Sequence, residues 1–160
     1  MKNTKTKATP KSAPKHLDLY KAVLADPYRR EMKETNDCVV VAITLLTRYS
    51  YKTVHTALKE AGRPDRKGTL RSVRDKALEA LKLEKVPFDL NAHIGKYAGV
   101  HKKMYNMTSY QPTRFPDIEF PDLYCSARQH AFAIKNGATE DWCHKNYLRV
   151  QEAFSLVKIK

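Results

Sequence analysis

The sequence contains few cysteines and no long apolar run. Its three cysteines, Cys38, Cys125 and Cys143, are odd in number and widely spaced, and they form no paired C-x₂-C motif. Such usage does not build a disulfide framework, so it predicts reduced thiols and a cytoplasmic setting. The longest apolar run, residues 39–46, is far shorter than the roughly 20 residues that a membrane-spanning helix needs. We therefore expect no membrane association.

Acidic residues are also scarce. The chain carries 30 Lys or Arg against 17 Asp or Glu, a net charge of +13. Residues 1–15 include five lysines and no acid, and no secretory apolar stretch follows them. We interpret residues 1–15 as a disordered basic arm and residues 16–160 as a single domain. The charge favours nucleic acid or an acidic protein as a partner, bound through the arm and a basic surface.

Hydrophobic periodicity changes along the chain, from helical spacing in the first part to strand-like alternation after residue 122. The expected helices lie within 16–30 (ended by Asp26-Pro27), 38–46, 51–61 (capped by Ser50), 70–81 (capped by Thr69) and 90–98. The expected strands are 123–126, 130–135, 138–143 and 148–157. Residues 63–85 hold eight Lys or Arg against four acids, which we interpret as a solvated helix surface. The predicted class is α+β.

Cys38 opens the apolar run, directly after the polar pair Asn36-Asp37. A cysteine at the first position of a buried helix lies at the positive end of the helix dipole, beside free backbone N–H groups. Because the thiolate is the reactive form of cysteine and this position stabilises it, Cys38 is a candidate nucleophile. The alternative is a small apolar residue that begins a core helix.

Asn136-Gly137 predicts a two-residue hairpin turn. In that register Lys135 pairs with Ala138, which places His130 and Asp141 on one face as diagonal neighbours. A histidine held by a carboxylate, together with a thiol, is the set that nucleophilic cysteine catalysis needs. Cys38, His130 and Asp141 are therefore the candidate catalytic residues.

Two short blocks in residues 30–158 resemble small phage-type proteins of the papain-like thiol peptidase class, and also the C39-type peptidases that cleave bacteriocin leaders. The first is Asn-Asp-Cys opening a buried helix, followed by a Tyr-x-x-Val-x-x-Ala-Leu helix and a Gly-Arg turn; the second is residues 130–137 followed by Asp141-Trp142. The resemblance implies a papain-like fold, in which an N-terminal helical lobe carries the nucleophile helix and packs on a C-terminal antiparallel β-sheet. It implies hydrolysis of a peptide or isopeptide bond in a protein substrate, without a cofactor. It also implies the bacterial host cytoplasm if the protein is phage-encoded, with virion association left open.

The chain departs from this family at the oxyanion site. Papain-like enzymes usually place a glutamine about six residues before the nucleophile, whereas this chain has Met32 there and no glutamine upstream. Asn36 is the candidate replacement donor. Because losing such a donor typically costs about 10²–10³ in rate, a catalytically weak or inactive protein of the same fold, which binds nucleic acid or a host protein, is the alternative function. A zinc site from Cys125, His130, Asp141, Cys143 and His144 is a third interpretation, although its spacing is not typical of zinc sites.

Overall fold

The computed structural model describes residues 18–95, 119–142 and 150–160. Within these ranges six helices and five strands follow in the order α1(Asp18–Leu24), α2(Pro27–Glu31), α3(Cys38–Leu46), α4(Tyr51–Glu60), α5(Arg71–Ala80), β1(Leu83–Pro87), α6(Leu90–Gly95), β2(Leu123–Ala127), β3(His130–Lys135), β4(Ala138–Glu140) and β5(Glu152–Lys158). The strands form one antiparallel sheet in the order β1-β5-β2-β3-β4. The predicted α+β class is confirmed. The basic arm, Cys143 and His144 lie outside the described residues.

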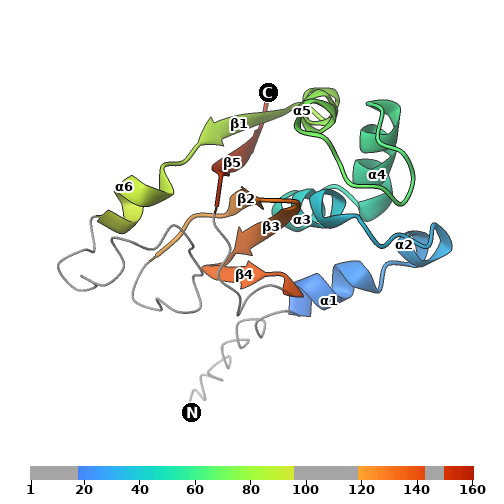
Figure 1. Ribbon diagram of the computed structural model, residues 1–160, viewed down its shortest axis with the longest axis horizontal. Helices are drawn as coiled ribbons and strands as arrows, with labels where there is room; N and C mark the ends of the chain where they lie inside the picture. The colour runs from blue at the N-terminus through green and yellow to red at the C-terminus, as the bar shows by residue number, and fades with distance from the viewer. Residues whose placement is uncertain (1–17, 96–118, 143–149) are drawn as a thin grey trace, which may run out of the picture.

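Helix α3 packs against strands β3 and β2, on one face of the sheet (Figure 1). Six of its nine residues are buried, as expected for a run without a polar face. Its neighbours α1 and α4 cover it from the sides, and α5 packs on α4 and β1. Buried Ala131 and Ala133 of β3 and Tyr124 of β2 belong to the same core as α3, so the sheet supports the helix that carries Cys38.

A second core is formed by the side chains of β2 and β3 that alternate along each strand with those of the first core. Leu123, Cys125, Phe132 and Ile134 pack together there with Leu90 and Phe120. Successive side chains of a strand point to opposite faces, so β2 and β3 contribute to both cores. The sheet is therefore covered on both faces at its centre. Because a one-residue slip would move every side chain to the opposite face, this packing fixes the register of the hairpin.

The β3–β4 hairpin has the predicted register. Lys135 pairs with Ala138, Ile134 with Thr139 and Ala133 with Glu140. Asn136 and Gly137 have φ values of 52° and 77°, as a type I′ turn requires. This register carries Asp141 to the end of the hairpin where β3 begins.

Several local predictions are wrong. The helix α1 ends at Leu24, before Asp26-Pro27 as predicted, but the second helix α2, which begins at Pro27, was not predicted; Asp26 caps it by accepting hydrogen bonds from the Tyr28 and Arg29 amides. Leu70, not Thr69, occupies the N-cap position of α5. The strand β1 was not predicted. Ser50 does cap α4, accepting a hydrogen bond from the Thr53 amide.

The solvated surface predicted for residues 63–85 is also partly wrong, because two of its arginines are buried. Arg63 and Arg74 are only 2% and 3% exposed. Arg74 donates to Glu152 at 2.7 Å and lies over the rings of Tyr124 and Phe154. A buried guanidinium needs such partners, and here they join α5 to the sheet.

Candidate active site

His130 and Asp141 form a direct hydrogen bond. The Nε2 atom of His130 lies 2.7 Å from Oδ2 of Asp141, and both side chains are largely buried, with 13% and 5% exposed. His130 is the first residue of β3, and Asp141 directly follows β4. A carboxylate that accepts the Nε2–H fixes the tautomer of the ring and leaves Nδ1 as the basic nitrogen.

Cys38 lies with this pair at one cavity of about 420 Å³, whose lining includes Cys38, His130 and Asp141. Cys38 is the first residue of α3 and is partly exposed. It also lines a second cavity with His130, of about 440 Å³. The fold therefore brings the three candidate catalytic residues, which are far apart in the sequence, to one region of the surface.

An internal network anchors the start of α3. The buried carboxylate of Asp37 accepts hydrogen bonds from Nε and NH2 of Arg29, at 2.7 and 3.1 Å, and from the Tyr51 hydroxyl at 2.6 Å. Burial, together with Asp37, raises the pKa of Tyr51 well above its usual value, so the phenol stays a donor. Asp37 occupies the N-cap position but makes no side-chain cap, so its side chain leaves the first amides of α3 unoccupied. No local sequence pattern reveals this network, because its members lie on three separate elements.

Tyr20 of α1 lies near Asp141. The Tyr20 amide donates to Glu140 at 3.2 Å, and its side chain lines the cavity of Cys38. Burial and the Asp141 carboxylate raise the pKa of Tyr20 to about 12. The Trp142 ring lies 5.1 Å from that of His130. Tyr20 and Trp142 thus line the same cavity as the hydrogen-bonded pair of His130 and Asp141.

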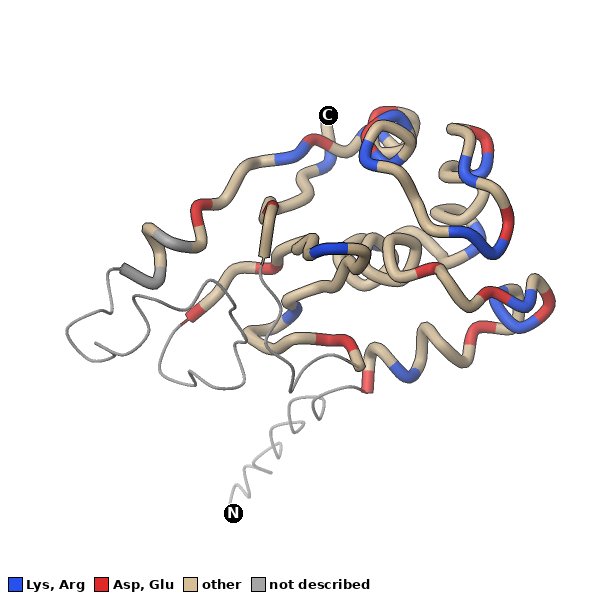
Figure 2. Tube along the Cα trace, in the orientation of Figure 1, with Lys and Arg blue, Asp and Glu red and all other residues tan. Residues whose placement is uncertain are grey.

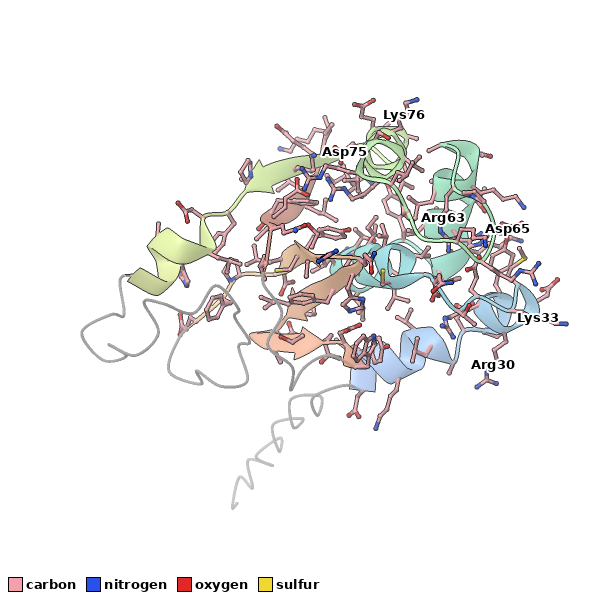
Figure 3. All side chains as sticks on the ribbon, in the orientation of Figure 1. Arg30, Lys33, Arg63, Asp65, Asp75 and Lys76 are labelled. Atoms are coloured by element: carbon pink, nitrogen blue, oxygen red, sulfur yellow. The ribbon has the colours of Figure 1, made fainter. Side chains whose placement is uncertain are left out.

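A buried ionic cluster centres on Glu34, in the segment that precedes Cys38. Glu34 accepts hydrogen bonds from His55 at 2.8 Å, from Arg63 at 2.9 and 3.1 Å, and from the Arg66 amide at 3.2 Å. Arg63 also donates to the Asn36 carbonyl. Burial opposes the charge on Glu34, but the bonds from Arg63 and His55 prevail and lower its pKa to about 2. Figure 3 labels Arg63 and its neighbour Asp65, on the loop that follows α4. This cluster ties the segment before Cys38 to that loop.

Asn36, the predicted oxyanion donor, lines the cavity of Cys38. Its Nδ2 donates to the Arg66 carbonyl at 3.2 Å, so one of its two N–H groups is used in holding the loop. Gln129, which no sequence motif singles out, lines both cavities from the turn before His130, with a φ of 58°. Asn36 and Gln129 both line the site, and both carry a side-chain amide that is able to donate hydrogen bonds.

The zinc interpretation receives no support from the position of Cys125. This residue is fully buried in the second core, beside Phe132, and it does not line the cavity of His130. Within the described ranges, one group has donor atoms close enough to hold a metal ion: Glu34, His55 and Asp65. There the Arg63 guanidinium already neutralises Glu34, so the charge that would attract a cation is satisfied internally.

Comparisons with protein-family models, with curated proteins and with solved structures give no match for this chain. The resemblance to papain-like thiol peptidases therefore stays a prediction, and functional inference depends on the site itself. Among the described residues, no helix has the length and apolar character to cross a membrane.

Proposed function

We propose that the protein is a thiol hydrolase of papain-like architecture, which cleaves a peptide or isopeptide bond through a thioester intermediate. One observation carries this proposal: Cys38 and His130 line the same cavities, and Asp141 holds the His130 ring at 2.7 Å. A thiol at a helix start beside a carboxylate-oriented imidazole is the arrangement that generates and protects a nucleophilic thiolate.

Each residue has a distinct role in the proposed reaction. Nδ1 of His130 takes the Cys38 proton, and the sulfur attacks the carbonyl carbon of the substrate. The oxyanion that forms accepts hydrogen bonds from the Cys38 amide and the Asn36 side chain. His130 then donates its proton to the leaving amine, which departs and leaves a thioester. Water, deprotonated by His130, hydrolyses the thioester and restores the thiol, while Asp141 stabilises the imidazolium throughout.

The rate of Cys38 alkylation by iodoacetamide, measured by mass spectrometry, tests the proposed thiol–imidazole pair. We expect His130→Gln to slow alkylation about 10²-fold at neutral pH, because it removes the base. His93→Gln is the matched control, since His93 bonds to the Glu119 carbonyl and packs between Phe88 and Phe120. Hydrolysis of fluorescent casein should require Cys38 and disappear in Cys38→Ser. Equal alkylation rates in wild type and His130→Gln would overturn the proposal.

The distribution of charge favours nucleic acid or an acidic protein as a second kind of partner. The described residues hold 19 Lys or Arg and 16 Asp or Glu, a net charge of +3; residues 1–17, 96–118 and 143–149 hold 11 Lys or Arg and one Asp, a net charge of +10. Figure 2 shows both signs interspersed along the described trace. Binding of nucleic acid or of an acidic protein would therefore depend on the positive charge of those three segments. Oligonucleotide binding by the full chain, followed by fluorescence anisotropy, should weaken steeply as salt rises; salt-independent binding would exclude this electrostatic origin.

A further inference from the structure

A further cavity lies at the end of α3 that is opposite Cys38, and we term it the distal cavity. It has a volume of about 600 Å³, and its lining includes Leu46, the last residue of α3, together with Leu83 of β1 and Leu156 of β5. Because each residue of a helix adds about 1.5 Å along its axis, Leu46 lies roughly 12 Å from Cys38 along α3. The distal cavity shares no lining residue with the two cavities at Cys38.

The strand residues of the distal cavity point to the face of the sheet that α3 covers. Phe154 of β5 belongs to the core that includes α3, and Leu156 and Lys158 follow it at alternate positions, so their side chains point to the same face. Lys135 has the same relation to Ala133 on β3. The distal cavity therefore lies between the sheet and the end of α3.

The charge of the distal cavity is unbalanced. Three basic side chains and no acidic one line it, although the described residues as a whole hold 19 Lys or Arg and 16 Asp or Glu. Asp122 compensates one of the three, because its carboxylate accepts a hydrogen bond from Lys135. Arg48 and Lys158 form no ion pair with any residue in the described part of the chain. Arg48 is exposed, and the Lys158 ammonium lies 6.0 Å from the centre of the Tyr49 ring.

The hydroxyl groups that line the distal cavity are used within the protein. Thr47 donates to the Ile43 carbonyl at 2.8 Å, and Tyr49 donates to the Leu81 carbonyl at 2.7 Å. The nitrogen atoms of Arg48 and Lys158 are therefore the main donors that the lining offers to a ligand. Because these groups donate and do not accept, and because charged acceptors form the strongest bonds with them, they favour an anion.

We propose that the distal cavity binds a small amphiphilic anion, with an apolar tail against the three leucines and an anionic head group at Arg48 and Lys158. The volume of about 600 Å³ lies within the range of roughly 300–1,000 Å³ that is typical of small-molecule sites. An anion without a tail would bury none of the leucine surface, and a neutral apolar ligand would not pair with the cations. Since the carbonyl end of a helix is negative, the head group lies at the two cations and the tail lies beside Leu46.

Titration of the ¹⁵N-labelled full-length protein, followed by NMR, tests the ligand class with probes that differ in one part. Octanoate has both a tail and a charged head, acetate has the head alone, and octanol has the tail alone. We expect octanoate to bind more than about tenfold more tightly than either, because it uses the leucines and the cations together. Octyl phosphate, titrated in parallel, identifies the preferred head group, and it should also exceed octanol.

The same spectra locate the ligand. We expect octanoate to shift the amide signals of residues 46–49 and 156–158. Shifts confined to Cys38, Gln129 and His130 would place the anion in the cavities at the start of α3 and would overturn the proposal. Absence of octanoate binding, or equal affinities for octanoate and octanol, would overturn it as well.

Arg48→Gln and Lys158→Gln test the contacts of the head group. Each removes one cation and keeps a long polar side chain, so each should weaken octanoate binding about fivefold, and the two together more than about tenfold. The affinity for octanol should be unchanged. Melting temperatures without ligand should change little, because both substitutions are outside the buried core.

Lys52→Gln is the matched control for Lys158→Gln. Lys52 is exposed and lies over the Tyr28 ring at 5.4 Å, much as Lys158 lies over Tyr49, but it does not line the distal cavity. Both substitutions lower the net charge by one. An equal loss of octanoate affinity in Lys52→Gln, or no loss in the double variant, would overturn the proposal. The result does not depend on whether His130 activates Cys38, so this proposal and the proposed function are tested separately.

Discussion

Glu34→Gln is the most informative test of how the protein holds the segment before Cys38. The wild-type carboxylate is buried among His55, Arg63 and the Arg66 amide. Its pKa falls from 4.5 to about 2, and each unit corresponds to about 1.4 kcal/mol. The interactions of the charged form therefore contribute about 3 kcal/mol to the free energy of unfolding at neutral pH. Loss of one member of a buried ion pair typically costs about 3–5 kcal/mol, which agrees with this value.

The pH dependence of this contribution has a definite sign. Because folding lowers the pKa of Glu34, the stabilisation is fully present above the unfolded value of 4.5 and is lost as pH falls towards 2. Wild type and Glu34→Gln should therefore differ by about 3 kcal/mol at pH 7 and converge near pH 2. Urea unfolding followed by circular dichroism at several pH values measures the difference.

Asp65→Asn is the matched control for Glu34→Gln. Asp65 also carries a carboxylate in this cluster and bonds to Lys59 at 2.7 Å, but its side chain is 33% exposed and that of Lys59 is 53% exposed. Solvent screens such a pair, so the substitution should have a far smaller effect. The reasoning is refuted if Glu34→Gln unfolds like wild type at pH 7, or if its deficit is unchanged at low pH.

Three further substitutions test the site and the hairpin. Asp141→Asn should lower kcat for peptide hydrolysis by about 10²–10⁴ with little change in KM, because Asp141 orients His130; steady-state kinetics measure both, and an unchanged kcat would exclude this role. Tyr51→Phe removes a hydrogen bond to a buried carboxylate and should lower the free energy of unfolding by about 2 kcal/mol in urea titrations; no loss would show that Arg29 suffices for Asp37. Gly137→Ala, at a φ of 77°, should cost about 1 kcal/mol in the same assay, and a neutral result would contradict the turn geometry.

The parts of the site that the sequence predicts are those with local signals. Asn136-Gly137 specifies a two-residue turn, and the turn fixes the pairing of Ala133 with Glu140 and so the position of Asp141. The unbroken apolar run specifies the buried helix α3. Both inferences need only neighbouring residues, and both agree with the structure.

The parts that were missed depend on contacts between distant segments. The strand β1 contains Pro87 and is largely exposed, with one buried residue. It is an edge strand that pairs with β5, and edge strands tolerate the proline and charged side chains that argue against a strand in a sequence. Arg63 looks like a surface residue until Glu34, 29 positions away, is placed beside it. A sequence pattern cannot supply such a partner.

The start of α3 breaks a local rule that the same chain obeys elsewhere. Asp26 and Ser50 cap their helices by accepting hydrogen bonds from first-turn amides, and aspartate is among the best capping residues. Asp37 occupies the N-cap position of α3, but its carboxylate accepts hydrogen bonds from Arg29 and Tyr51 and not from the first-turn amides. The lost cap costs roughly 1 kcal/mol, which these bonds offset from outside the helix. Departures from local preference that distant contacts support are characteristic of functional sites. Here the departure leaves α3 without a side-chain cap at Cys38, the residue whose amide the proposed reaction uses as a donor to the oxyanion.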